Sequence, residues 1–131
     1  MREILFRGKT EQGKWVYGFY HNETSIESPS SDRKITRHHI YTQDFDKFVI
    51  PETIGQFTGL TDKNGKKIFE GDIVRVDKDG DILQIIYCNR GYFCADNNAW
   101  WEFIDELGDI QIIGNIHDNP ELLEVQNGNN G

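Results

Sequence analysis

Short apolar or alternating runs separated by tight turns follow one another along the whole chain, a pattern typical of β-strands. In the N-terminal part, residues 2–8 and 14–20 are two such runs around a polar turn that ends in glycine. They predict a β-hairpin. Further strands are expected over residues 35–41 and 48–50, before Pro51.

Residues 22–34 form the longest polar stretch of the chain. A cluster of Ser, Asn, Asp and Pro without apolar periodicity is a loop signal, so we expect a mobile loop there. Whether this loop becomes ordered on binding a partner stays open.

After Pro51 the strand signals are closely spaced. Residues 53–60 alternate, and the turn at 61–65 ends in Asn-Gly, whose residues tolerate the positive φ of a tight hairpin. Gly71 and Asp72 predict a sharp turn in which the carboxylate bonds nearby backbone. About four or five short strands with tight turns predict a small SH3-like barrel in this half.

Residues 98–107 are the only good helix candidate of the chain. Four apolar residues there fall at i, i+3, i+4 and i+7, which is one helical face. They are Trp100, Phe103, Ile104 and Leu107. We expect Trp100 in the core and Trp101 at the margin of the apolar face. A last strand over 109–116 and a single helical turn over 119–123 complete the pattern.

The length of 131 residues suits one compact domain or a small domain with an extension. The predicted fold class is mainly β, with a β-rich part at 1–50, an SH3-like barrel part at 51–125 and a disordered tail at 126–131. A single domain over the whole chain is the alternative organisation.

The net charge of −8 is unevenly placed, because residues 1–50 carry +1 and residues 51–131 carry −9. An acidic C-terminal part disfavours contacts with nucleic-acid phosphates. A surface for a basic partner, mimicry of DNA and plain solubility remain open as its purpose. No apolar run reaches the length of a membrane span or a signal peptide, so we expect a cytoplasmic protein with reduced cysteines.

Three stretches resemble the YopX-like family of phage and prophage proteins. The first joins Ile4–Gly8 to Gly13–Gly18, the second and longest is Pro51–Val74, and the third is Ile112–Leu123. They occur in the family's order and span nearly the whole chain. The resemblance implies an accessory or host-interacting role, but no reaction, cofactor or catalytic residue that could be carried over.

The one basic patch consists of Arg33, Lys34 and Arg37, with Tyr20 and Tyr41 available for base stacking. That mixture is what a single-stranded nucleic-acid site needs, although the rest of the molecule is acidic. Trp101 is the candidate anchor for a protein partner, since a part-exposed Trp often carries binding energy.

Metal and cofactor sites are not expected. His38 and His39 are adjacent and would face opposite sides of a strand, while His21 and His117 are distant in sequence. If Arg90-Gly91 is a two-residue turn, Cys88 and Cys94 lie on opposite faces of their hairpin. No nucleophile, base or paired-carboxylate arrangement emerges from the spacing.

These observations favour a non-enzymatic phage accessory protein that binds a protein partner, either a host protein or a second copy of itself. A single-stranded nucleic-acid-binding module is the second hypothesis. An acidic DNA mimic that binds a host protein is the third.

Overall fold

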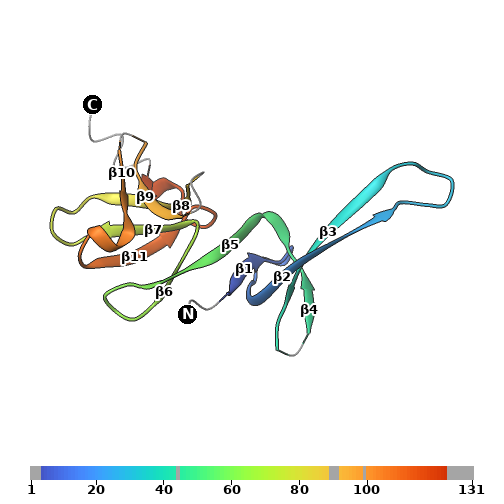
Figure 1. Ribbon diagram of the computed structural model, residues 1–131, viewed down its shortest axis with the longest axis horizontal. Coiled ribbons are helices and arrows are strands. Elements are labelled where there is room, and N and C mark those ends of the chain that lie inside the picture. The colour runs from blue at the N-terminus through green and yellow to red at the C-terminus, as the bar shows by residue number, and fades with distance from the viewer. Residues whose placement is uncertain (1–3, 44, 89–91, 99, 124–131) are drawn as a thin grey trace. The chain divides into compact units, whose positions relative to one another are not determined.

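The computed structural model describes residues 4–43, 45–88, 92–98 and 100–123; the predicted tail at 126–131 lies outside them. The chain divides into two compact units, Met1–Gln56 and Phe57–Gly131, which we call unit 1 and unit 2. Antiparallel β-strands make up most of both units (Figure 1), which confirms the mainly-β fold class. The expected boundary at residue 51 falls inside a strand, β5 (Ile50–Thr61).

Unit 1 is an antiparallel sheet with the strand order β4-β3-β2-β1-β5. Its strands are β1 (Phe6–Lys9), β2 (Trp15–Ile26), β3 (Lys34–Tyr41), β4 (Asp46–Phe48) and the first part of β5. The predicted N-terminal hairpin is confirmed: β1 pairs with β2, and the Thr10 amide donates to the Lys14 carbonyl across the turn at 2.9 Å.

The predicted loop at 22–34 is shorter than expected: residues 22–26 belong to β2, β3 begins at Lys34, and only residues 27–33 connect the two strands. β2 continues to Ile26 and pairs with β3 without interruption, from Phe19 opposite Tyr41 to Ile26 opposite Lys34. The two strands form the long arm of Figure 1. Polarity misled the prediction, because a two-stranded arm with both faces in solvent needs no apolar side and can be held by cross-strand pairs such as Thr24 and Thr36.

The two faces of the unit 1 sheet differ in character. One face carries the small core, in which Val16, Ile40 and Val49 are buried and Phe6, Tyr20 and Ile54 pack against them. Because side chains alternate along a strand, the other face receives the odd-numbered residues of β2 and β3. These include His21, His39 and the exposed rings of Tyr17, Phe19 and Tyr41.

Unit 2 is built on a five-stranded antiparallel sheet with the order β10-β9-β8-β7-β11. Its strands are β7 (Asp72–Val76), β8 (Ile82–Tyr87), β9 (Phe93–Asp96), β10 (Trp101–Phe103) and β11 (Ile110–Asn115). A further strand, β6 (Lys67–Phe69), pairs with the last part of β5. The sheet curls around a core that includes Ile68, Val74, Val76, Leu83 and Ile85, as expected for a small SH3-like half-barrel (Figure 1).

The turns of unit 2 follow their sequence signals. Gly65 of the Asn-Gly pair has φ 82°, and Gly71 has φ 96°. Asp72 is buried and its Oδ2 accepts a hydrogen bond from the Phe69 amide at 2.8 Å, as predicted. Asp62 holds the preceding turn, because one carboxylate oxygen accepts from the amides of Asn64 and Lys66, both at 2.9 Å.

The helical element predicted at 98–107 is a 3-10 turn, η1 (Ile104–Glu106), and the residues before it are strand β10. Ile104 and Leu107 are buried as expected, but Trp100 is 40% exposed and does not lie in the core. The i, i+3, i+4 spacing fits a helix and also a strand followed by a tight turn, because either conformation directs these apolar side chains toward the core. The helical turn expected near the C-terminus is present over residues 121–123.

Candidate functional site

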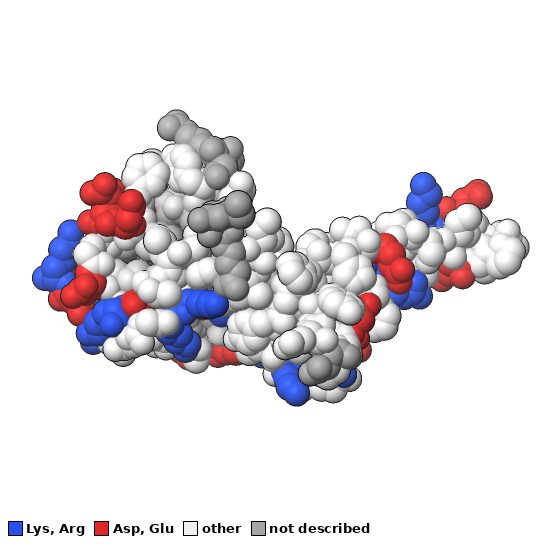
Figure 2. Space-filling view, turned by 60° about the horizontal axis from the view of Figure 1, so that its bottom comes forward, with Lys and Arg blue, Asp and Glu red and all other residues white. Residues whose placement is uncertain are grey.

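The predicted basic patch does not form one surface. Lys34 and Arg37 both belong to β3, but three positions separate them, so they project to opposite faces. Arg33 lies next to Glu27, with 3.7 Å between Nη1 and Oε1, and Arg37 Nη1 donates to Ser25 Oγ at 3.3 Å. Figure 2 shows blue and red atoms side by side along the β2–β3 arm, so its charges are mixed rather than basic.

The uneven charge distribution along the chain corresponds to the division into two units. Unit 1 has eight Lys and Arg against eight Asp and Glu, whereas unit 2 has six against fourteen. The whole net charge of −8 therefore belongs to unit 2. Between Tyr92 and Leu123 the sequence has no Lys or Arg at all.

Trp101 belongs to a cluster of three aromatic rings, two on the edge strand β10 and one, Tyr92, just before β9. The Trp101 and Phe103 rings meet edge to face, with centroids 5.3 Å apart, and Tyr92 lies 4.9 Å from Phe103 and 6.3 Å from Trp101. Trp101 is 47% exposed and Phe103 is 39% exposed. We call these three residues the β10 aromatic cluster.

The β10 aromatic cluster has acidic neighbours. Asp96 stands directly opposite Trp101 in the β9–β10 pairing, so the two side chains share a face of the sheet. The first turn of η1 adds Asp105 and Glu106 and contains no basic residue. Large rings beside carboxylates form a surface suited to a cation.

The cysteines lie on the same face, contrary to the prediction. Tyr87 pairs with Phe93 and Ile86 pairs with Cys94, while the Cys88 amide donates to the Tyr92 carbonyl at 2.8 Å. The pairing is shifted by one residue from the predicted one, and a shift of one residue exchanges the faces of a strand. The expected turn at 90–91 lies outside the described residues.

The two thiols interact. Burial raises the pKa of Cys94 to about 11, and the neighbouring Cys88 thiol and the Asp96 carboxylate act in the same direction. Cys94 is therefore a protonated, buried thiol at neutral pH.

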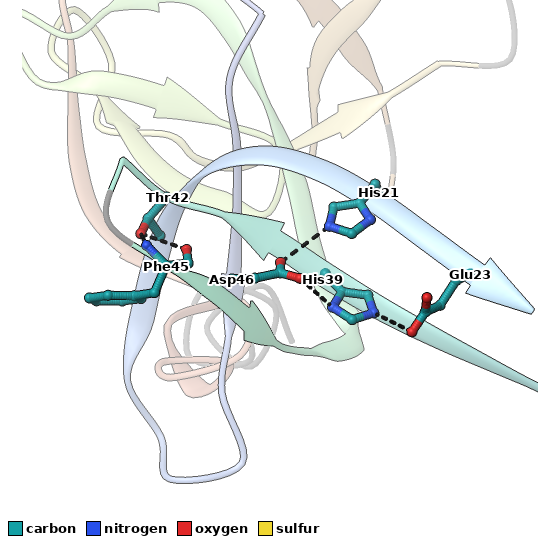
Figure 3. A network of polar contacts seen from close by, with 6 residues as sticks. All are labelled: His21, Glu23, His39, Thr42, Phe45 and Asp46. Atoms are coloured by element: carbon teal, nitrogen blue, oxygen red, sulfur yellow. Dashed lines mark hydrogen bonds and ion pairs between the residues drawn. The ribbon is translucent and has the colours of Figure 1, made fainter.

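A second cluster lies on the face of the unit 1 sheet opposite its small core, where β2, β3 and β4 meet (Figure 3). His21 Nε2 lies 3.2 Å from Asp46 Oδ1, and His39 Nδ1 lies 3.1 Å from Asp46 Oδ2. The two imidazole rings are stacked, with centroids 4.6 Å apart and 13° between their planes. We call His21, His39 and Asp46 the histidine cluster.

Each strand supplies its member of the histidine cluster through ordinary sheet geometry. His21 of β2 is the direct cross-strand partner of His39 of β3. Asp46 of β4 is diagonal to His39, because Phe48 pairs with His39 and Asp46 pairs with Tyr41. The turn before Asp46 is closed by Thr42, whose amide and hydroxyl both donate to the Phe45 carbonyl at 2.8 Å.

Comparison with known proteins identifies the family. The YopX protein family matches residues 5–124. The chain belongs to the YopX family. The resemblance seen in the sequence is thereby confirmed, and the match includes residues of both units.

Among solved structures, this YopX-family protein is similar to the crystal structure of protein EF1440 from Enterococcus faecalis. The two share 28% sequence identity and a TM-score of 0.50, over 94% of this chain and 99% of that chain. A search of curated proteins found no match. The described part of the chain contains no helix that is long and apolar enough to cross a membrane.

Sequence reasoning missed the histidine cluster of this YopX-family protein. The pairing of the two histidines could have been found from their residue numbers. In a regular antiparallel hairpin, the numbers of any two paired residues add up to the same value. Phe19 and Tyr41 give the same sum as Ile26 and Lys34, and so do His21 and His39. Treating residues 22–34 as a loop removed this register and left the two histidines looking unrelated.

Proposed function

We propose that this YopX-family chain is a non-enzymatic protein-interaction module, of phage or prophage origin, that anchors its partner on the β10 aromatic cluster. The observation that carries the proposal is the exposure of rings that already contact one another: Trp101 at 47% and Phe103 at 39%. Aromatic residues of this kind are over-represented among those that dominate protein interfaces.

The position of the cluster supports this role. β10 is an edge strand of three residues, and among the described strands none pairs with its outer side. An edge strand can accept an extended segment of another chain. The cluster places three rings at that edge, where they can hold the side chains of such a segment.

The partner's chemistry follows from charge. Unit 2 carries the whole net charge of the protein, and Asp96 lies on the same face as Trp101. A protein segment that contains Lys or Arg would pair with the carboxylates and could place a cation over the Trp101 or Tyr92 ring. The partner is therefore a basic segment of another protein. A second copy of this chain is less favoured, because its unit 2 is equally acidic.

The test is affinity purification of the tagged full-length chain from its bacterial host, with nuclease treatment of the eluate. Wild type, Trp101→Ala and Phe19→Ala are compared. Phe19 is a 65% exposed aromatic residue in unit 1, so its variant controls for non-specific hydrophobic binding. We expect a nuclease-resistant protein, rich in Lys and Arg, whose affinity falls at least about tenfold in Trp101→Ala and is unchanged in Phe19→Ala. Equal capture by wild type and Trp101→Ala would reject the anchor.

The other function classes give different results in the same experiment. Nucleic acid that disappears on nuclease treatment, and binding lost when Arg33, Lys34 and Arg37 are changed to Glu, would favour the single-stranded nucleic-acid module. A captured DNA-binding protein that is released by duplex DNA would favour the DNA mimic. Light-scattering mass distinguishes a second copy of the chain from a foreign partner.

A further inference from the structure

We propose that the histidine cluster of unit 1 is a binding site for a divalent transition-metal ion, with Zn²⁺ as the expected ion. One ring nitrogen of His21, one ring nitrogen of His39 and one Asp46 carboxylate oxygen all lie within 4.8 Å of one another. No sequence motif marks these residues, because they come from three strands and are brought together only by the pairing of β2, β3 and β4.

The spacing of the ligand atoms suits a small ion. Ligands bound to zinc at about 2.0–2.2 Å are about 3.3 Å from one another in a tetrahedral site. His21 Nε2 lies 3.2 Å from Asp46 Oδ1 and His39 Nδ1 lies 3.1 Å from Asp46 Oδ2, so each imidazole is already close to this separation from one oxygen of the carboxylate. One nitrogen of each ring and one Asp46 oxygen lie within 4.8 Å of one another, and the exposed His21 ring can rotate to close this distance.

His39 is held in the orientation that a metal ligand needs. It is 5% exposed, and the Phe48 ring packs against it with centroids 4.5 Å apart. Its Nε2 makes no hydrogen bond in the described part of the chain, and Glu23 Oε1 lies 3.4 Å from it. A ligating histidine usually gives its second ring proton to a carboxylate, and a small movement of Glu23 would complete that contact (Figure 3).

The ligand set selects the class of ion. Two imidazoles and one carboxylate suit zinc and its first-row neighbours, whereas calcium and magnesium prefer all-oxygen sites. The side chains of His21 and Asp46 are 47% and 41% exposed, so water can complete the coordination. The site is thus buried on the His39 side and open on the other.

A bound ion would attach β4 to β2 and β3 through side chains, which the small core of unit 1 does not do. All three residues of β4 are exposed, and the buried core of the unit is small. Metal ligation would join β4 to β2 and β3 through Asp46. Metal sites commonly stabilise small folds in this way, because the binding energy contributes to folding.

The test is isothermal titration of the chelator-stripped, tag-free full chain with ZnCl₂, followed by Co²⁺ titration read by visible absorption. We compare wild type with His21→Ala and Asp46→Asn, whose targets are exposed and need not disturb the fold. We expect one Zn²⁺ per chain and at least about a tenfold loss of affinity in each variant. Glu23→Gln should weaken binding by about tenfold, as other supporting carboxylates do.

His117→Ala in unit 2 is the matched control, and its zinc affinity should equal that of wild type. Cys88→Ser tests the other candidate ligands. The proposal is overturned if wild type shows no saturable binding, or if His21→Ala and Asp46→Asn leave the affinity unchanged. It is also overturned if Cys88→Ser removes the binding, because the ion would then be held by the thiols of unit 2.

Discussion

His21 and His39 face each other directly across β2 and β3, with their imidazole rings stacked 4.6 Å apart and Asp46 within 3.2 Å of both. The relationship depends on the register of the β2–β3 arm, because a slip of one residue would move one ring to the opposite face. Residues that fix this register therefore control whether the histidine cluster exists.

Gly18 is one of these residues. A Cβ at Gly18 would collide with the Tyr41 carbonyl on the neighbouring strand β3. Gly18→Ala should therefore push β2 and β3 apart and cost about 1–3 kcal/mol of unfolding free energy. Thermal and urea unfolding measure this. A Cβ at Gly65 would meet no atom within 4 Å, so Gly65→Ala should lower the unfolding free energy only through the strain of its positive φ. An equal or smaller loss of unfolding free energy in Gly18→Ala would contradict the close approach of β2 and β3.

Asp62 supports unit 2 through backbone hydrogen bonds. It is 6% exposed and accepts from Asn64 and Lys66 at the turn and from the Ile112 amide of β11 at 3.1 Å. Asp62→Ala leaves those amides without their acceptor and should cost about 2–4 kcal/mol in urea unfolding. The control Asp79→Ala removes an exposed carboxylate with one backbone bond, to Asp81, and should cost less than about 1 kcal/mol.

The same carboxylate makes stability depend on pH. Burial acts to raise the pKa of Asp62, but the hydrogen bonds from Ile112, Lys66 and Asn64 and the Lys66 charge hold it below its ordinary 3.8. A lowered pKa adds stability that is present above pH 3.8 and is lost as the pH falls through the folded value. The stability difference between wild type and Asp62→Asn should be constant near neutral pH and shrink below pH 3.8. A difference that grows on acidification would contradict this.

The two thiols should react at different rates. Cys94 is 1% exposed, and a pKa of about 11 leaves about one thousandth of it as thiolate at pH 8. Iodoacetamide at pH 8 should therefore modify Cys88 well before Cys94 in the native protein, and both in denaturant. Peptide mass spectrometry follows each site. Equal rates in the native protein would contradict the burial of Cys94.

The sequence was most informative where a local signal required one conformation. The Asn64-Gly65 turn, the sharp turn at Gly71 with its Asp72 carboxylate, and the N-terminal hairpin all appear as predicted. Each depends on residues close in sequence. Residues 98–107 were harder, because the apolar spacing fitted both a helix and the strand and 3-10 turn that form there.

The candidate sites depend on pairing between distant residues, and this is why the sequence located them poorly. Trp101 was identified alone, whereas its contacts with Tyr92 and Phe103 require the β9–β10 register. The face shared by Cys88 and Cys94 was missed through a one-residue error in a turn. The basic patch looked continuous because Arg33, Lys34 and Arg37 are near in sequence, yet strand alternation separates their side chains.

The most direct measurement of the histidine cluster is a two-dimensional ¹⁵N NMR titration of the full chain with ZnCl₂, including the imidazole nitrogens. The structure predicts that the largest changes fall on Nε2 of His21, Nδ1 of His39 and the amides around Asp46, with increased exchange protection along β4. Spectra that do not change, or changes centred on Cys88 and Cys94, would contradict a metal site in unit 1.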